Sequence, residues 1–150
     1  MRFGSMSPPP FPIPSTESLP IFSDNVIPSM LVHLGVIDLS ASPSLNSLFT
    51  EASEVEKLLT NPVAAERTSV RRREGPVVNK EQSFILRAAA IDACELIVAT
   101  AKRLGETAPD RVWMKGMELS ELDAWLWQYS KDRDDYRELD RFVDRDTVFF

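Results

Sequence analysis

The segment between Asn79 and Gly105 constrains the fold of this chain more than any other. Asn79 is followed three residues later by Gln82, a spacing typical of a capping box at a helix N-terminus. No proline interrupts the segment, apolar side chains cover most of its helical circumference, and Gly105 suits a C-terminal stop. The sequence therefore predicts one long helix over residues 80–104, central to the core of a mainly α-helical domain.

Shorter helices are expected on both sides of this segment. Asp24 and Asn25 are both good N-caps, and apolar residues follow them at helical spacing up to Gly35, which suits the C′ position. A second helix is expected over residues 121–131, capped by Ser120, with one apolar face formed by Leu122, Trp125, Leu126 and Tyr129. The other expected elements are short helices at 43–50 and 53–60, the latter capped by Ser53, a loop at 61–78, and weak strand candidates at 35–39 and 147–150.

Residues 1–18 differ from the rest of the chain because they are rich in proline. Proline lacks an amide donor and fixes φ, so this segment suits neither a helix nor a central strand. We expect a disordered or extended tail, either inert or serving as a proline-rich ligand for a partner domain. Residues 19–150 are expected to form a single helical region.

Composition excludes several classes of protein. The net charge of -6 argues against a broad nucleic-acid surface, and no apolar run reaches the roughly 18 residues of a membrane span. One cysteine, Cys94, and one histidine, His33, provide neither an intrachain disulfide nor an ordinary zinc site, and both are expected in the core. The lone cysteine and the lack of a secretory signal favour a cytoplasmic location, with a nuclear one as the alternative. The cluster Arg71–Arg73 forms either a solvated loop or a contact for a small anion such as a nucleotide phosphate.

Asp24, Asp123 and Trp127 are the residues best suited to chemistry. A helix N-terminus favours the ionised form of Asp24, and a charged carboxylate can attack or stabilise an oxocarbenium-like sugar carbon. Asp123 and Trp127 lie one helical turn apart, so an indole face and a carboxylate can together recognise a flat heterocyclic base. Each has a structural alternative: Asp24 as a plain N-cap, Asp123 closing a capping box with Ser120, and Trp127 packing against a neighbouring helix.

Three segments resemble, in order, the C-terminal half of the queuosine salvage family. They are LPIFSDNVIPSMLVHLGV, LRAAAIDACELIV and LDAWLWQYSKDRDDYRELDRFVDRDTVFF. The resemblance implies a helical fold similar to helix-hairpin-helix DNA glycosylases and an activity that hydrolyses queuosine 5'-phosphate, releasing queuine for salvage into tRNA. It implies no metal and no organic cofactor, a small nucleotide as the partner, and no direct contact with nucleic acid.

The resemblance also assigns site residues. Asp24 matches the family's catalytic aspartate, Phe22 and Ser23 match residues that line the base pocket, Asp123 matches a base-binding carboxylate, and Trp127 belongs to the same element. The chain departs from the family in two respects: the N-terminal half has no counterpart, and the C-terminal region carries no histidine.

Two alternatives to the hydrolase remain open. A non-catalytic helical module derived from the same family would expose apolar surface and self-associate or bind a partner. A helical nucleic-acid binder is the third interpretation, and the net charge of -6 counts against it.

Overall fold

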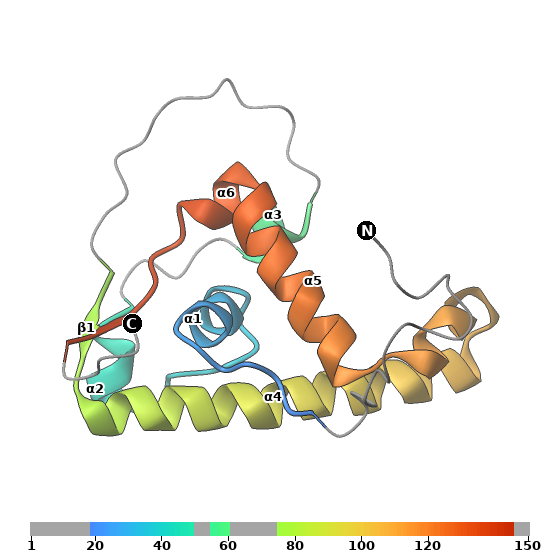
Figure 1. The fold of residues 1–150 in the computed structure, drawn as a ribbon, viewed down its shortest axis with the longest axis horizontal. Coiled ribbons are helices and arrows are strands. Elements are labelled where there is room, and N and C mark those ends of the chain that lie inside the picture. Colours follow the sequence, from blue (N-terminus) through green and yellow to red (C-terminus); the bar gives the residue numbers. More distant parts are fainter. Residues whose placement is uncertain (1–18, 50–54, 61–74, 146–150) are drawn as a thin grey trace, which may run out of the picture.

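The computed structural model describes residues 19–49, 55–60 and 75–145, and this part of the chain is mainly helical, as predicted (Figure 1). Its helices and strands are α1 (Val26–His33), α2 (Pro43–Asn46), α3 (Val55–Leu59), β1 (Val77–Val78), α4 (Lys80–Thr107), the 3₁₀ helix η2 (Pro109–Gly116), α5 (Leu119–Asp132), α6 (Asp134–Arg137) and β2 (Val143–Asp144). The predicted tail at 1–18, the Ser53 cap, the cluster Arg71–Arg73 and the strand candidate at 147–150 lie outside the described residues.

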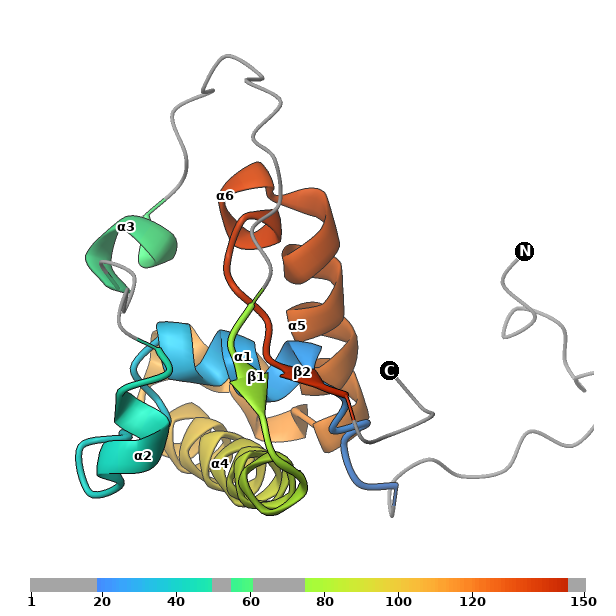
Figure 2. The same cartoon turned by 90° about the vertical axis from the view of Figure 1, so that its left-hand side faces the viewer.

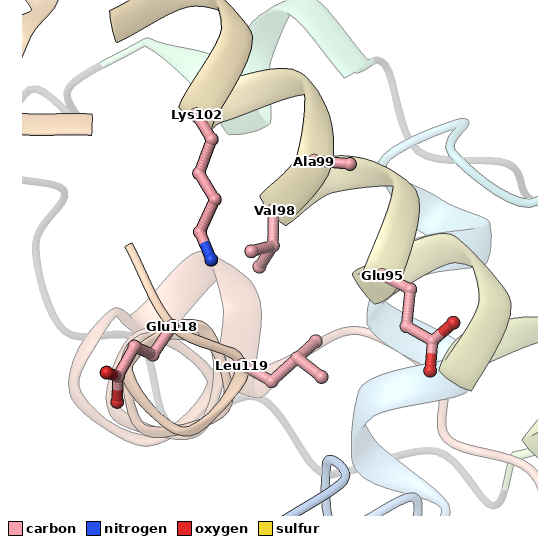
Figure 3. Close-up of a pocket in the computed structure, with 6 residues that line it drawn as sticks. All are labelled: Glu95, Val98, Ala99, Lys102, Glu118 and Leu119. Atoms are coloured by element: carbon pink, nitrogen blue, oxygen red, sulfur yellow. The ribbon is translucent and has the colours of Figure 1, made fainter. Parts of the chain in front are cut away.

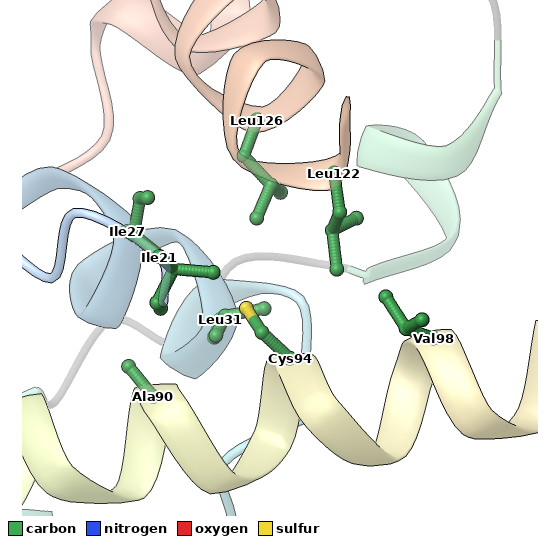
Figure 4. Packing of buried hydrophobic residues seen from close by; sticks show 8 residues of the cluster. All are labelled: Ile21, Ile27, Leu31, Ala90, Cys94, Val98, Leu122 and Leu126. Carbon is green, nitrogen blue, oxygen red and sulfur yellow. The ribbon is translucent and has the colours of Figure 1, made fainter. Parts of the chain in front are cut away.

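The short helix α1 occupies the centre of the fold. Every one of its residues is buried, and it packs against both α4 and α5 (Figures 1 and 2). Because apolar residues dominate α1, all sides of it can be covered without burying an unpaired charged side chain. Figure 4 shows the core cluster that joins the three helices, formed by Ile21, Ile27, Leu31, Ala90, Cys94, Val98, Leu122 and Leu126.

The long helix α4 is not the central helix that its apolar circumference predicted. One face is buried, through Ser83, Leu86, Ala90, Cys94, Val98, Ala101 and Gly105. Phe84, Ile85 and Leu96 on its other faces are exposed. The burial of α4 was therefore overpredicted, because the rest of the described chain covers only one side of it (Figure 1).

The prediction for the start of α4 is confirmed, whereas the prediction for its end is wrong. The predicted capping box is present: Asn79 Oδ1 accepts from the Gln82 amide at 2.9 Å, and Gln82 Oε1 accepts from the Asn79 amide at 2.9 Å. Gly105, however, does not end the helix, which continues to Thr107. A Cβ at Gly105 would lie 2.7 Å from the backbone nitrogen of Lys115, so this glycine allows η2 to pack directly on α4.

The turn after α1 explains why the strand candidate at 35–39 is wrong. Gly35 has a φ of +69°, its amide donates to the Val32 carbonyl, and the Val36 amide donates to the Leu31 carbonyl. This Schellman motif confirms Gly35 as the C′ residue and uses the amides that a strand would need. The strands that do form are β1 and β2, which pair in parallel, so Val77 and Val78 do not belong to the predicted loop.

The N-terminus of α5 also differs from the prediction. The helix begins at Leu119, and its capping box joins Glu118 to Glu121 rather than involving Ser120. Leu122 and Leu126 are buried as predicted, but Trp125 is exposed and stacks on Tyr129 with ring centroids 4.2 Å apart. Asp123 therefore closes no capping box.

A polar stripe on α1 holds the last described segment. The Asn25 side chain donates to the Phe142 carbonyl at 3.0 Å, Ser29 Oγ accepts from the Phe142 amide at 3.1 Å, and His33 Nε2 lies 2.9 Å from the Asp140 carbonyl. These three positions follow one another at intervals of four, so they share one face of α1. The stripe explains how His33 sits satisfied in the core, as predicted.

Candidate functional site

Asp24 lies directly before α1, where the chain enters the core. Its side chain is only 3% exposed, and Oδ1 accepts from the amides of Val26 at 2.7 Å and Ile27 at 3.3 Å. Asn25, the other candidate cap, makes no capping bond with its side chain. Asp24 therefore has the geometry of the N-cap alternative.

Asp123 approaches the same region from α5. Its Oδ1 is buried and has no hydrogen-bond partner among the described residues. Burial raises the pKa of this carboxyl, the backbone N–H of Phe22 opposes that change, and the charge of Asp24 raises the pKa further. Asp24 and Asp123 are far apart in the sequence, but the fold brings them within electrostatic range of each other.

Cys94 of α4 is the third member of this group, although its sequence context predicted only a small core residue. Its side chain is fully buried. Burial raises the pKa of the thiol to about 11, and the charge of Asp123 adds to the effect. The N-terminus of α1, the middle of α4 and the first turns of α5 thus meet around Asp24, Asp123 and Cys94, which we call the acid cluster.

Phe22 and Ser23 lie beside the acid cluster, but their side chains have different environments. The phenyl ring of Phe22 is 63% exposed, whereas its backbone N–H acts on Asp123. Ser23 Oγ donates to the Arg87 carbonyl at 3.0 Å, which ties the segment before α1 to α4. An exposed phenyl ring beside two acids remains available to a flat ligand.

Trp127 is half-buried and packs against the core cluster, one turn after Asp123. The Lys131 ammonium lies 3.8 Å from the centroid of its indole ring, in the geometry of a cation–π contact. One face of the indole is therefore occupied by Lys131. A ligand that stacks on Trp127 would need the other face or would have to displace this lysine.

A hollow of about 490 Å³ opens between α4 and the start of α5 (Figure 3). Its lining combines apolar and charged side chains, namely Glu95, Val98, Ala99, Lys102, Glu118 and Leu119. Leu119 lies one turn before Asp123, and Glu95 follows Cys94, so the hollow adjoins the acid cluster without including it. Its size falls within the range of small-molecule sites. None of the five residues predicted for the site lines it.

The described ranges contain neither a candidate metal cluster nor a helix that could span a membrane. Within them, no group of three or more His, Cys, Asp or Glu side chains could hold a metal ion. No helix of the described residues is long and apolar enough to cross a membrane.

Comparison of the chain with models of known protein families, with curated proteins and with solved structures gave no match. The acid cluster therefore has to be interpreted from its own chemistry.

Proposed function

We propose that this protein hydrolyses the N-glycosidic bond of queuosine 5'-phosphate and releases queuine. The observation that supports the proposal is the meeting of Asp24 and Asp123, close enough for the charge of one to raise the pKa of the other. Cleavage of a glycosidic bond needs a carboxylate that can face a developing positive charge on the sugar. A pair of acids with different environments is a common arrangement for such chemistry.

Asp24 is the residue that faces the sugar in this proposal. Hydrolysis forms a bond between a water oxygen and the anomeric carbon and breaks the bond from that carbon to the base nitrogen, whose electron pair leaves with the base and takes up a proton. The amides of Val26 and Ile27 donate to the carboxylate and hold it in place. A preorganised negative charge stabilises the oxocarbenium-like transition state without further rearrangement.

Asp123 and Trp127 are the residues that recognise the base. Asp123 Oδ1 has no partner among the described residues, so a ring or amine N–H of the base would satisfy an otherwise costly buried acceptor. The indole of Trp127 offers an apolar surface on the same face of α5. No metal or organic cofactor has a role in this scheme.

The decisive experiment measures free queuine by mass spectrometry after incubation with queuosine 5'-phosphate. We expect release by the wild type, a loss of about 100-fold or more in Asp24→Asn, and a higher KM in Asp123→Asn. Asp92→Asn, which changes an exposed carboxylate on α4, is the matched control and should keep full activity. Full release by Asp24→Asn would refute the role of Asp24, and no release by a folded wild type would refute the function.

A non-catalytic interaction module is the second candidate function, favoured by the exposed apolar side chains of Phe84 and Ile85 near the start of α4. Neighbouring apolar groups on a surface often mark a contact with another protein. Size-exclusion chromatography over a range of concentrations separates the candidates. Concentration-dependent association that Phe84→Ser abolishes would favour the module, whereas a monomer at all concentrations would count against it.

A further inference from the structure

A large apolar groove lies on the side of α5 opposite Asp123, between the C-terminal half of α4, η2 and the first turns of α5. It has a volume of about 830 Å³, and its lining includes Leu96, Leu104, Trp113, Met114, Met117 and Trp125. Two of these side chains are prominently exposed, Trp113 at 67% and Leu96 at 68%. The groove has no part in the proposed hydrolysis and needs a separate explanation.

The chemistry of the groove is unusual for a protein surface. Among the described residues that line it, Glu121 is the only charged one. The remaining lining is dominated by aliphatic, aromatic and methionine side chains, and the ring of Trp125 stacks on that of Tyr129. Grooves lined by aromatic rings are typical receptors for polyproline II segments, and methionines adapt to the shape of an occupant.

The chain itself contains a segment of matching chemistry. Residues 8–14 read PPPFPIP, and residues 3–16 carry no charged side chain. Proline fixes φ near the polyproline II value, so such a segment loses little conformational entropy when it docks. We propose that residues 8–14 of this chain dock in the groove of Trp113 and Trp125.

The lengths involved are compatible with this arrangement. The lining of the groove along α4 runs from Ala93 to Leu104, about 16 Å at the rise of an α-helix. Seven residues of polyproline II span about 22 Å, enough to cover it. Ile21 shares the core cluster with Leu122, which also lines the groove. Residues 15–19 can reach about 16 Å when extended. This reach exceeds the diameter of an α-helix, about 10 Å, so the linker is long enough for the segment to pass α5 and enter the groove.

Paramagnetic broadening in the full-length protein tests the docking. Ser7→Cys places a single reactive thiol next to the segment, because the native Cys94 is buried with a pKa raised to about 11. A nitroxide tag at position 7 should broaden the indole N–H signals of Trp113 and Trp125 and spare that of Trp127, which lies on the other face of α5. Trp113→Phe and Trp125→Phe assign the signals.

The matched control carries the same tag in a chain whose prolines at 8, 9, 10, 12 and 14 are changed to serine, and it should lose the selective broadening. A mixture of tagged, isotopically unlabelled chain with untagged, ¹⁵N-labelled chain should show no broadening, since the docking is within one molecule. Equal broadening of all three indoles, broadening of none, or broadening in the mixture would each overturn the proposal. Because the readout needs no substrate, its outcome is independent of whether the protein releases queuine.

Discussion

Asp24 allows a folding role to be separated from a chemical one. Its Oδ1 accepts from the amides of Val26 at 2.7 Å and Ile27 at 3.3 Å. Asparagine keeps a carbonyl oxygen in the same place and ranks with aspartate as an N-cap, so Asp24→Asn should change the free energy of unfolding by less than about 0.5 kcal/mol. Asp24→Ala removes the acceptor and leaves two buried amides without it, which should cost about 1–2 kcal/mol.

Thermal unfolding followed by far-UV circular dichroism measures both variants. For a domain of this size, about 1 kcal/mol corresponds to about 3–6 °C in Tm. We therefore expect Asp24→Asn within about 3 °C of the wild type and Asp24→Ala lower by about 3–12 °C. A loss of activity in Asp24→Asn can then be assigned to chemistry rather than to unfolding. If Asp24→Asn lowered Tm as much as Asp24→Ala, the negative charge would be the stabilising feature, and the reasoning from the hydrogen-bond acceptor would be refuted.

Three further predictions concern the acid cluster and the packing of α4. The pKa of Asp123 is raised by burial and by the charge of Asp24, so its carboxyl favours folding at low pH and loses that contribution as pH rises through the folded-state pKa. Asp123→Asn should therefore gain stability over the wild type as the pH rises above the ordinary aspartate pKa of 3.8, and a difference in Tm that stays constant with pH would contradict this. Cys94 is buried and has a pKa of about 11, so at pH 8 it should react with a chromogenic disulfide about 100-fold more slowly in the native protein than in guanidinium. Equal rates would show that the thiol is accessible in the native protein. Gly105→Ala should lower the free energy of unfolding, measured in urea, by about 1–3 kcal/mol because the added Cβ would meet the backbone of η2. Gly116→Ala is the control and should change that free energy little, because the space around Gly116 is open. Similar values for the two variants would refute the close approach of η2 to Gly105.

The positions where helices begin and end were predictable where a few neighbouring residues decide them. The box of Asn79 with Gln82 and the stop at Gly35 are both present as predicted. Such caps depend on side chains and amides within about four residues of one another, so the local sequence can predict them. Where two local caps compete the choice can still fail, as at α5, where the box of Glu118 with Glu121 forms in place of the predicted cap at Ser120. The Gly105 prediction failed for the opposite reason, because the role of this glycine is set by Lys115 of another element.

The sequence by itself determined a mainly helical chain, its principal helices, and the candidate acids Asp24 and Asp123. Only the tertiary structure decided that α1 is the central helix, that one side of α4 stays exposed, and that Cys94 joins the two acids. Periodicity shows that a helix has an apolar face but does not show what will cover it. Which faces are buried, and which carboxylates come together, follows from long-range packing among helices that the local pattern does not encode.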